Sequence, residues 1–309
     1  MPESPPRGRI VWHELLTTDP DGAIAFYHKV VGWGSTVFAA DPPYRTWTMD
    51  GVPMGGMMRM PADAQAPPSW RVYVAVPEVD RTVEQAARLG ARTWVPGTEI
   101  PNVGRFAVLG DPQGATFAVY KPSIPGAGSD EAVVGDFSWH ELATTDWRAA
   151  WEFYRALFGW EHASSFDMGP MGTYWMFRRG GGSITLGGLF NKTGDAPAQW
   201  LSYVRVPDAD RAAALARRNG GRVMNGPMDV PGGDRIAMLA DPQGAAFAVH
   251  TPAARAAPRK PAAKPKKKTS RAAQAKRKPA TRPAAKRRTV AKRRPARKPV
   301  GRKAVRKKK

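Results

Sequence analysis

Two stretches of the chain place apolar side chains with the spacing of an amphipathic helix, and signals for a helix start and stop flank both. The apolar positions are Ala23, Phe26, Tyr27 and Val30 in the first stretch and Ala150, Phe153, Tyr154 and Leu157 in the second. Both sets follow the i, i+3, i+4, i+7 pattern of one buried helix face. Asp19 and Asp146 stand where an N-cap is needed, Pro20 suits the first helical position, and Gly32 and Gly159 end the helices. The pattern therefore predicts two capped helices.

Apolar runs with glycine interruptions predict strands around these helices. The expected strands are Ile10–Thr17, Tyr44–Met49, Gly55–Met60 and Trp70–Val76, and then Phe137–Thr144, Thr173–Arg178, Ile184–Phe190 and Trp200–Val206. A second helix is expected in each half, starting near Asp80 and Asp210 and ending at Gly90 and Gly220. Further strands follow, divided by an Asp-Pro-Gln-Gly sequence that suits a type I turn.

The same succession of elements occurs twice because the sequence itself repeats. Trp12–Asp19 reads WHELLTTD and Trp139–Asp146 reads WHELATTD, while Asp-Pro-Gln-Gly occurs at Asp111 and again at Asp241. The offsets are 127 and 130 residues (139 − 12 and 241 − 111), the length of a small domain rather than of a solenoid unit. We therefore predict a first domain at 8–122, a linker at 123–136 and a second domain at 137–252.

These features together resemble the vicinal oxygen chelate superfamily, which includes glyoxalase I, bleomycin-resistance proteins and extradiol dioxygenases. The resemblance covers residues 8–250 and rests on the Phe-Tyr and Gly-Trp pairs of the helix, the Asp-Pro-Gln-Gly turn before a Phe-Ala-Val strand, and four modules in sequence. It implies an α+β fold in which four βαβββ modules form two tandem domains with curved mixed sheets. It also implies a cup that holds a divalent metal or a small ligand. Whether modules pair within a copy or across copies stays open.

The resemblance further implies strand positions from which the metal enzymes of the family draw their ligands. On the opening strands these positions fall on Trp12 and Trp139, with His13 and His140 one residue away. The next positions fall near Arg71 and Leu201, and the last on Ala118 and Ala248, which cannot ligate a metal. The expectation is therefore a site without the usual metal set and without a predicted cofactor. A divalent metal held by an atypical set of His13, His140 and His250 is the alternative.

Glu14 and Glu141 are the candidate catalytic residues. Alternation along a strand puts Glu14 on the same face as Trp12 and His13 on the opposite face. A carboxylate buried in an apolar cup would have a raised pKa, which suits a general base. The competing interpretations are a structural carboxylate bound to an arginine or the backbone, and, for His13, a packed and hydrogen-bonded histidine.

Aromatic and arginine side chains complete the expected ligand pocket. The candidates are Trp12, Trp139, Trp47, Trp175, Tyr73, Tyr203, Arg105 and Arg235. Aromatic residues would line an apolar pocket, and the matched arginines would hold an anionic substrate. The alternatives are core packing for the aromatic residues and surface ion pairs for the arginines. No nucleophile elbow, phosphate loop or dinucleotide-binding fingerprint occurs in the sequence.

Charge divides the chain into two parts. The formal net charge is +22, but residues 253–309 contain 26 Lys and Arg and no Asp or Glu, which leaves 22 basic and 26 acidic residues in 1–252. This tail has no aromatic residue and resembles the Lys/Ala/Pro tails of linker histones, so we expect it to be disordered and to bind nucleic acid without sequence preference. The candidate contacts are Lys266, Lys267, Lys268, Lys276, Arg277, Lys278, Lys286, Arg287, Arg288, Lys292, Arg293 and Arg294. RNA, polyphosphate, an anionic membrane surface and a role in solubility are the alternatives.

The chain has no Cys, no signal-peptide pattern and no apolar run of 18 residues. A cytoplasmic, nucleoid-associated protein is therefore expected, and a homodimer is open. The predicted function is metal-free binding of a small organic ligand in the cup, combined with nucleic-acid binding by the tail. The alternative is a glyoxalase-, lyase-, isomerase- or hydroxylase-like enzyme that uses Glu14 and Glu141 or an atypical histidine metal site.

Overall fold

The computed structural model describes residues 7–124 and 129–253, so the predicted nucleic-acid contacts in the tail lie outside the described residues. The first copy comprises β1 (Ile10–Thr17), α1 (Pro20–Val31), β2 (Gly34–Ala40), β3 (Pro43–Met49), β4 (Val52–Arg59), β5 (Ser69–Ala75), α2 (Val79–Arg88), β6 (Arg92–Ile100), β7 (Gly104–Gly110) and β8 (Thr116–Pro122). The second comprises β9 (Phe137–Thr144), α3 (Trp147–Phe158), β10 (Glu161–Asp167), β11 (Thr173–Arg178), β12 (Thr185–Asn191), β13 (Gln199–Arg205), α4 (Ala209–Arg218), β14 (Arg222–Asp229), β15 (Arg235–Ala240) and β16 (Ala246–Thr251), with a short 3₁₀ turn at Gly169–Met171.

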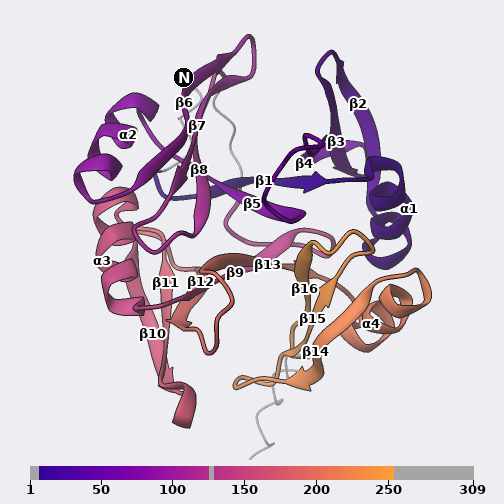
Figure 1. The fold of residues 1–309 in the computed structure, drawn as a ribbon. Helices are drawn as coiled ribbons and strands as arrows, with labels where there is room; N and C mark the ends of the chain where they lie inside the picture. Colours follow the sequence, from indigo (N-terminus) through magenta and orange to yellow (C-terminus); the bar gives the residue numbers. More distant parts are fainter. Residues whose placement is uncertain (1–6, 125–128, 254–309) are drawn as a thin grey trace, which may run out of the picture. The chain divides into compact units, whose positions relative to one another are not determined.

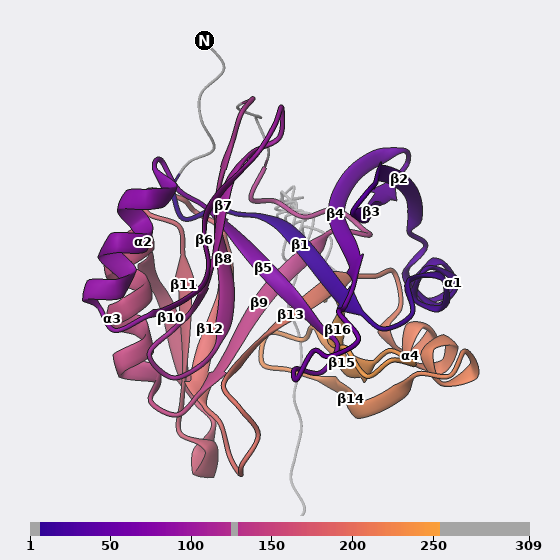
Figure 2. The same cartoon turned by 45° about the horizontal axis from the view of Figure 1, so that its top comes forward.

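Each copy folds into its own curved, mixed sheet of eight strands (Figures 1 and 2). The strand orders are β2-β3-β4-β1-β5-β8-β7-β6 and β10-β11-β12-β9-β13-β16-β15-β14. In the first sheet β1 runs parallel to β4 and antiparallel to β5, so the two βαβββ modules of one copy join at its centre. The predicted α+β class and four modules are confirmed, and the modules pair within a copy.

The helix boundaries follow from their caps. The Asp19 side chain accepts a hydrogen bond from the Gly22 amide, and Pro20 begins α1 as expected. At the other end Gly32 has φ +84°, a left-handed conformation that glycine adopts without the Cβ penalty of other residues. In the second copy, Asp146 and Gly159 cap α3 in the same way.

One face of each sheet is covered by helices, and these helices pack across the two copies. In both views α1 lies beside α4, and α2 lies beside α3 (Figures 1 and 2). One buried cluster joins α1 and β3 of the first copy to α4 and β16 of the second. The other joins β5 and β8 of the first copy to α3 of the second. Hydrophobic burial between the copies therefore makes one body of the two domains.

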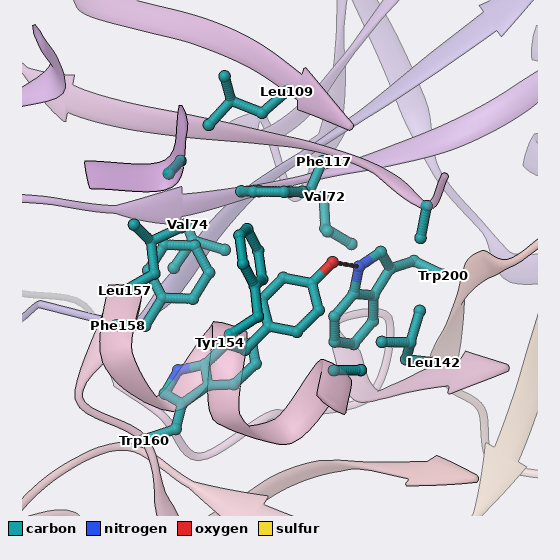
Figure 3. Packing of buried hydrophobic residues seen from close by; sticks show 14 of the residues in the cluster. Val72, Val74, Leu109, Phe117, Leu142, Tyr154, Leu157, Phe158, Trp160 and Trp200 are labelled. Carbon is teal, nitrogen blue, oxygen red and sulfur yellow. Dashed lines mark hydrogen bonds between the residues drawn. The ribbon is translucent and has the colours of Figure 1, made fainter. Parts of the chain in front are cut away.

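A buried tyrosine at the centre of each cluster joins the two repeated motifs. The Tyr154 hydroxyl on α3 donates to the Asp111 carboxylate of the other copy's turn at 3.0 Å. It accepts from Trp200 Nε1 at 3.1 Å (Figure 3). Burial of the carboxylate is the main cause that raises the pKa of Asp111, and the hydrogen bonds it accepts oppose that shift.

The same arrangement holds the opposite corner of the body. The Tyr27 hydroxyl donates to the Asp241 carboxylate at 3.2 Å and accepts from Trp70 Nε1 at 2.8 Å. The Phe-Tyr helix motif of each copy thus binds the Asp-Pro-Gln-Gly turn of the other copy. The amide of the fourth turn residue, Gly114, donates to the Asp111 carbonyl at 3.0 Å, which confirms the expected turn.

Within the described ranges, none of the helices combines the length and the apolar character that crossing a bilayer requires.

Candidate functional site

The opening strand of each copy presents alternate residues to opposite faces of its sheet. Trp12 packs with Tyr73 in a cluster formed by strand residues only, on the face that the helices do not cover. Glu14 shares this face, because its carboxylate bonds to the Tyr73 hydroxyl. His13 points the other way and stacks on Phe137 of the second copy. The side chains therefore take the faces that strand alternation predicts.

Glu14 is the centre of the first carboxylate cluster, which comprises Trp12, Glu14, Tyr44, Arg71 and Tyr73. Glu14 Oε1 accepts from the Tyr44 hydroxyl at 3.0 Å, and Oε2 accepts from Tyr73 at 2.8 Å and from Arg71 at 3.1 Å. The Tyr44 hydroxyl also accepts from Trp12 Nε1 at 3.2 Å. Three side chains from β3 and β5 thus hold one carboxylate that is 5% exposed, and Trp12 of β1 holds Tyr44 in turn.

Glu141 is the centre of the second carboxylate cluster, which comprises Trp139, Glu141, Tyr174, Leu201 and Tyr203. Glu141 Oε2 accepts from Tyr174 at 2.8 Å and Oε1 from Tyr203 at 3.2 Å. The Tyr174 hydroxyl accepts from Trp139 Nε1 at 2.9 Å. The arrangement repeats that of the first copy except at Leu201, which stands beside Glu141 in the register where the first copy has an arginine.

The missing arginine changes the electrostatics of the second cluster. Burial is the main cause that raises the pKa of Glu141 above its usual value, and the hydrogen bonds from Tyr174 and Tyr203 oppose that shift only in part. Burial, with the adjacent carboxylate, also raises the pKa of Tyr174 and Tyr203 well above that of free tyrosine. Both phenols are therefore neutral donors at neutral pH, and Glu141 is the group in this cluster that can exchange a proton.

Tyr44 and Tyr174 are site residues that the local sequence pattern does not indicate. The feature of the sequence that could have indicated these tyrosines is the repeated Gly-Gly pair on the neighbouring strand, Gly55-Gly56 and Gly187-Gly188. A Cβ on Gly56 would overlap the Tyr44 hydroxyl, and a Cβ on Gly188 would overlap the Tyr174 ring. These two glycines therefore make room for the tyrosines, in addition to any bend that a Gly pair permits.

Trp47 and Trp175 lie on the helix-covered face instead of in the expected pocket. Trp47 is fully buried and packs against Tyr27, and Trp175 stacks on Trp147 with ring centroids 5.0 Å apart. The reason is strand alternation. Trp175 directly follows Tyr174 on β11, so the two side chains take opposite faces.

Arg105 and Arg235 likewise lie away from the carboxylate clusters. Arg105 forms an ion pair with Asp80 at the start of α2 at 2.8 Å, and Arg235 pairs with Asp210 at the start of α4 and with Asp229 at 3.0 Å. The hydrogen bond to Asp80 is the main cause that raises the pKa of Arg105, and the carboxylates do the same for Arg235. The surface ion pair that was the alternative interpretation is what the structure contains.

His13 and His140 meet at the contact between the copies, where their Nε2 atoms are 2.8 Å apart. His140 Nδ1 lies 3.1 Å from the Leu186 carbonyl. Burial lowers the pKa of His140 from 6.5 to about 4, and burial together with the neighbouring ring lowers that of His13 well below 6.5. Both rings are therefore neutral at neutral pH.

His250 does not join this histidine pair, because its ring bonds to Asp234 and to Ser138. Residues 7–124 and 129–253 contain no cluster of three or more His, Cys, Asp or Glu side chains positioned to hold one metal ion. In the carboxylate clusters, the alanines at 118 and 248 lie in register with Tyr73 and Tyr203 and are fully buried. The donor set around either glutamate therefore does not fit the metal that the fold family commonly binds.

Comparisons with known proteins match both copies. Residues 136–249 match the family described as the Glyoxalase/Bleomycin resistance protein/Dioxygenase superfamily, and residues 11–120 match the family described as Glyoxalase-like domain.

Curated relatives span nearly the whole body of the chain. The protein named "Putative glyoxylase CFP32" of Mycobacterium tuberculosis is 33% identical over 248 residues, which cover 78% of this chain and 94% of the relative. The anthracycline biosynthesis protein DnrV of Streptomyces peucetius is 30% identical over 260 residues, which cover 78% and 92%. Among solved structures, the Mn(II)-bound glyoxalase from Novosphingobium aromaticivorans is 15% identical with a TM-score of 0.58, over 80% of this chain and 82% of that one. This likeness concerns the fold alone.

Proposed function

Because the chain belongs to the glyoxalase/bleomycin resistance protein/dioxygenase superfamily, we propose that it binds small oxygenated organic molecules over its two carboxylate clusters. The observation that carries the proposal is the recurrence of one hydrogen-bonded Trp-Tyr-Glu-Tyr arrangement on the uncovered face of both sheets. Burying a carboxylate costs folding free energy, and buried groups of this kind gather at functional sites.

The clusters have hydrogen-bonding capacity left for a ligand. An ionised carboxylate has about four acceptor positions. Glu14 uses three of them for Tyr44, Tyr73 and Arg71, and Glu141 uses two. A ligand hydroxyl or N–H group is therefore recognised at either cluster, with the indole rings of Trp12 and Trp139 beside it.

The names of the relatives favour the same chemical class. An anthracycline is a fused-ring aromatic compound with hydroxyl and ketone groups, and a relative that is 30% identical bears the name of an anthracycline biosynthesis protein. Flat aromatic ligands of this kind stack on indole and phenol rings while their hydroxyl groups bond to a carboxylate.

A thermal-shift screen on the full chain tests this proposal, using a panel of hydroxylated ketones, phenols and anthraquinones. A compound present at 100 times its Kd adds about 2.7 kcal/mol of stability, or roughly 5 °C in Tm for a body of this size. Glu14→Gln with Glu141→Gln is expected to abolish the shift. The control is Glu161→Gln, an exposed carboxylate paired with Arg178. A Tm rise that persists in the double glutamine variant would refute the assignment.

We propose acid–base catalysis at Glu141 as a second function, favoured by its raised pKa. A glutamate of this kind takes a proton from a carbon next to a carbonyl and returns it to a neighbouring atom, which is an isomerisation without a redox partner. Protein-catalysed exchange of the carbon-bound hydrogen for solvent deuterium in D₂O measures the first step on any ligand found by the screen. Exchange that is lost in Glu141→Gln but retained in Glu14→Gln supports the assignment, and equal exchange in all three proteins overturns it.

We propose that residues 253–309 bind nucleic acid, on the evidence of their 26 Lys and Arg side chains without any acidic residue. Such a polycation displaces condensed counterions, so affinity should fall steeply with salt. The test compares the full chain with a variant in which the twelve candidate Lys and Arg residues are Gln, using duplex DNA, single-stranded RNA and polyphosphate. Loss of DNA binding at low salt in the variant is expected. Retention of full affinity would contradict the proposal.

A further inference from the structure

A serine, a histidine and an aspartate form a continuous hydrogen-bonded series in the second copy. Ser138 Oγ on β9 lies 2.9 Å from His250 Nδ1 on β16, and His250 Nε2 lies 2.9 Å from Asp234 Oδ2, directly before β15. None of its members bonds to Glu14 or Glu141, although Ser138 directly precedes Trp139 of the second carboxylate cluster on β9.

The protonation pattern of this series follows from its partners. Since an ionised aspartate only accepts hydrogen bonds, the neutral form of the His250 ring has its proton on Nε2 and the lone pair on Nδ1. The Ser138 hydroxyl therefore donates to Nδ1, and this 2.9 Å bond is shorter than its 3.4 Å alternative to the Tyr203 carbonyl. Asp234 is itself held, since its Oδ1 accepts from the Ala253 amide at 2.7 Å. The base thus faces the hydroxyl with its free nitrogen.

The first copy builds the same strands without this series. By the repeat offsets, Val11 stands in place of Ser138, Tyr120 in place of His250, and Gly104 in place of Asp234. The Tyr120 hydroxyl donates instead to the Val103 carbonyl at 2.8 Å. The fold therefore forms with an apolar residue, a phenol and a glycine at these positions, so the polar series is not a requirement of the architecture.

Ser138 lines a cavity of about 660 Å³ between the two copies. The apolar part of its wall includes Ile10, Phe137 and Leu186, and Arg9 lines the same cavity together with its ion-pair partner Asp130. This volume falls in the range of pockets that take small organic ligands. A nucleophile on this wall would meet a substrate with an apolar portion.

We propose that Ser138 is a nucleophile for acyl transfer, with His250 as its general base and Asp234 as the positioning residue. The substrate class is a carboxylic ester or thioester with an apolar acyl chain. Ser138 Oγ attacks the acyl carbon while its proton passes to His250 Nδ1, and that proton then leaves with the departing alcohol or thiol. Water, deprotonated by the same nitrogen, cleaves the acyl-serine and returns the free hydroxyl, so no redox partner is needed.

The roles match those of a serine–histidine–aspartate triad, with the two ring nitrogens exchanged. The chemistry requires only that one nitrogen face the hydroxyl and that the other be fixed by the carboxylate. In this chain Nδ1 of His250 faces the Ser138 hydroxyl, and Nε2 is fixed by the Asp234 carboxylate. Asp234→Asn would favour the tautomer of His250 with its proton on Nδ1. The positioning role of Asp234 can therefore be followed by spectroscopy of the His250 ring.

The test is covalent labelling of the full chain with an alkyl fluorophosphonate, followed by peptide mass mapping and by hydrolysis of p-nitrophenyl butyrate. Label is expected on Ser138, absent in Ser138→Ala and at least tenfold slower in His250→Gln, with unchanged labelling in Ser164→Ala. Ser164 is the control because it is an exposed serine on β10 that does not line this cavity.

Two further variants, one at the positioning residue and one at a surface carboxylate, complete the test. In spectra of ¹⁵N-histidine protein, Asp234→Asn should shift the His250 proton from Nε2 and slow labelling together. Glu161→Gln, an exposed carboxylate paired with Arg178, should leave labelling unchanged. Label on a different residue, or no label on the wild-type chain, would overturn the proposal whatever the variants do.

Discussion

Acidification from pH 7 to pH 5 should destabilise the protein through the histidine pair between the copies. His13 and His140 are neutral and buried in the folded state, but in the unfolded chain each would titrate near 6.5. The unfolded state therefore binds more protons as the pH falls below about 6.5. The contribution of the histidine pair to stability is complete above that pH and decreases as the pH falls. It reaches its lowest value below the folded pKa of His140, about 4.

The magnitude follows from the two pKa values of His140. The pKa of His140 is 6.5 in the unfolded chain and about 4 in the folded state. Full protonation therefore lowers the free energy of unfolding by roughly 3 kcal/mol, because each pKa unit corresponds to about 1.36 kcal/mol. At pH 5 the unfolded form is almost fully protonated and the folded form is not, so about 2 kcal/mol is already lost. His13 adds to this loss in the same direction, since burial and the neighbouring ring lower its pKa as well.

Buried carboxyl groups act in the opposite direction. Burial raises the pKa of Asp111, Asp241 and Glu141, so the folded state binds their protons more strongly than the unfolded chain does. These three groups favour folding as the pH falls, and the wild-type curve alone does not isolate the histidines. Only the difference between wild type and a histidine variant does so.

Urea unfolding of the full chain at pH 7 and pH 5 measures that difference, with His13→Gln and His140→Gln combined in one variant. Between pH 7 and pH 5, the free energy of unfolding of the wild type should fall by at least about 2 kcal/mol more than that of the double variant. This holds even if the variant is less stable at both pH values. The control is His162→Gln, an exposed histidine on β10, which should follow the wild type. Equal pH dependence in wild type and double variant would refute the buried neutral pair.

Three other substitutions test separate parts of the structure. Leu201→Arg should lower the pKa of Glu141 by placing a cation beside it, as a ¹³C-carboxyl titration would show; an unchanged or higher value would contradict the role given to this position. Gly188→Ala should cost about 1–3 kcal/mol in urea unfolding, because its Cβ overlaps the Tyr174 ring and breaks the bond to Glu141; unchanged stability would argue against this packing. Tyr154→Phe should also cost about 1–3 kcal/mol, since it leaves the turn aspartate of the other copy buried without that donor, and a neutral result would remove the proposed contact between the motifs.

Local patterns predicted the elements that bury one face or carry caps. The strands Ile10–Thr17, Phe137–Thr144 and Thr173–Arg178 have the expected bounds. The edge strands β2 and β10 were not located from the residues. Most of their side chains are exposed or half-buried, so no alternation of apolar and polar residues marked them.

The candidate site was only half predictable for a related reason. The face taken by Glu14 follows from the period of a single strand, whereas Tyr44 reaches Glu14 from β3, and β3 is separated from β1 by β4. Trp47 was expected in the pocket because of its residue type. Its distance of three positions from Tyr44 puts it on the other face of β3.

The sequence by itself determined the duplication, the helix caps, the turn and the face that each strand residue takes, because these depend on neighbours a few positions away. Tertiary structure decided which segments meet. It paired the modules within each copy, brought His13 to His140, set Leu201 beside Glu141, and placed Ser138 against His250. The physical reason is that strand and helix periods fix the direction of a side chain, while its partner depends on register and packing between segments that are distant in the sequence.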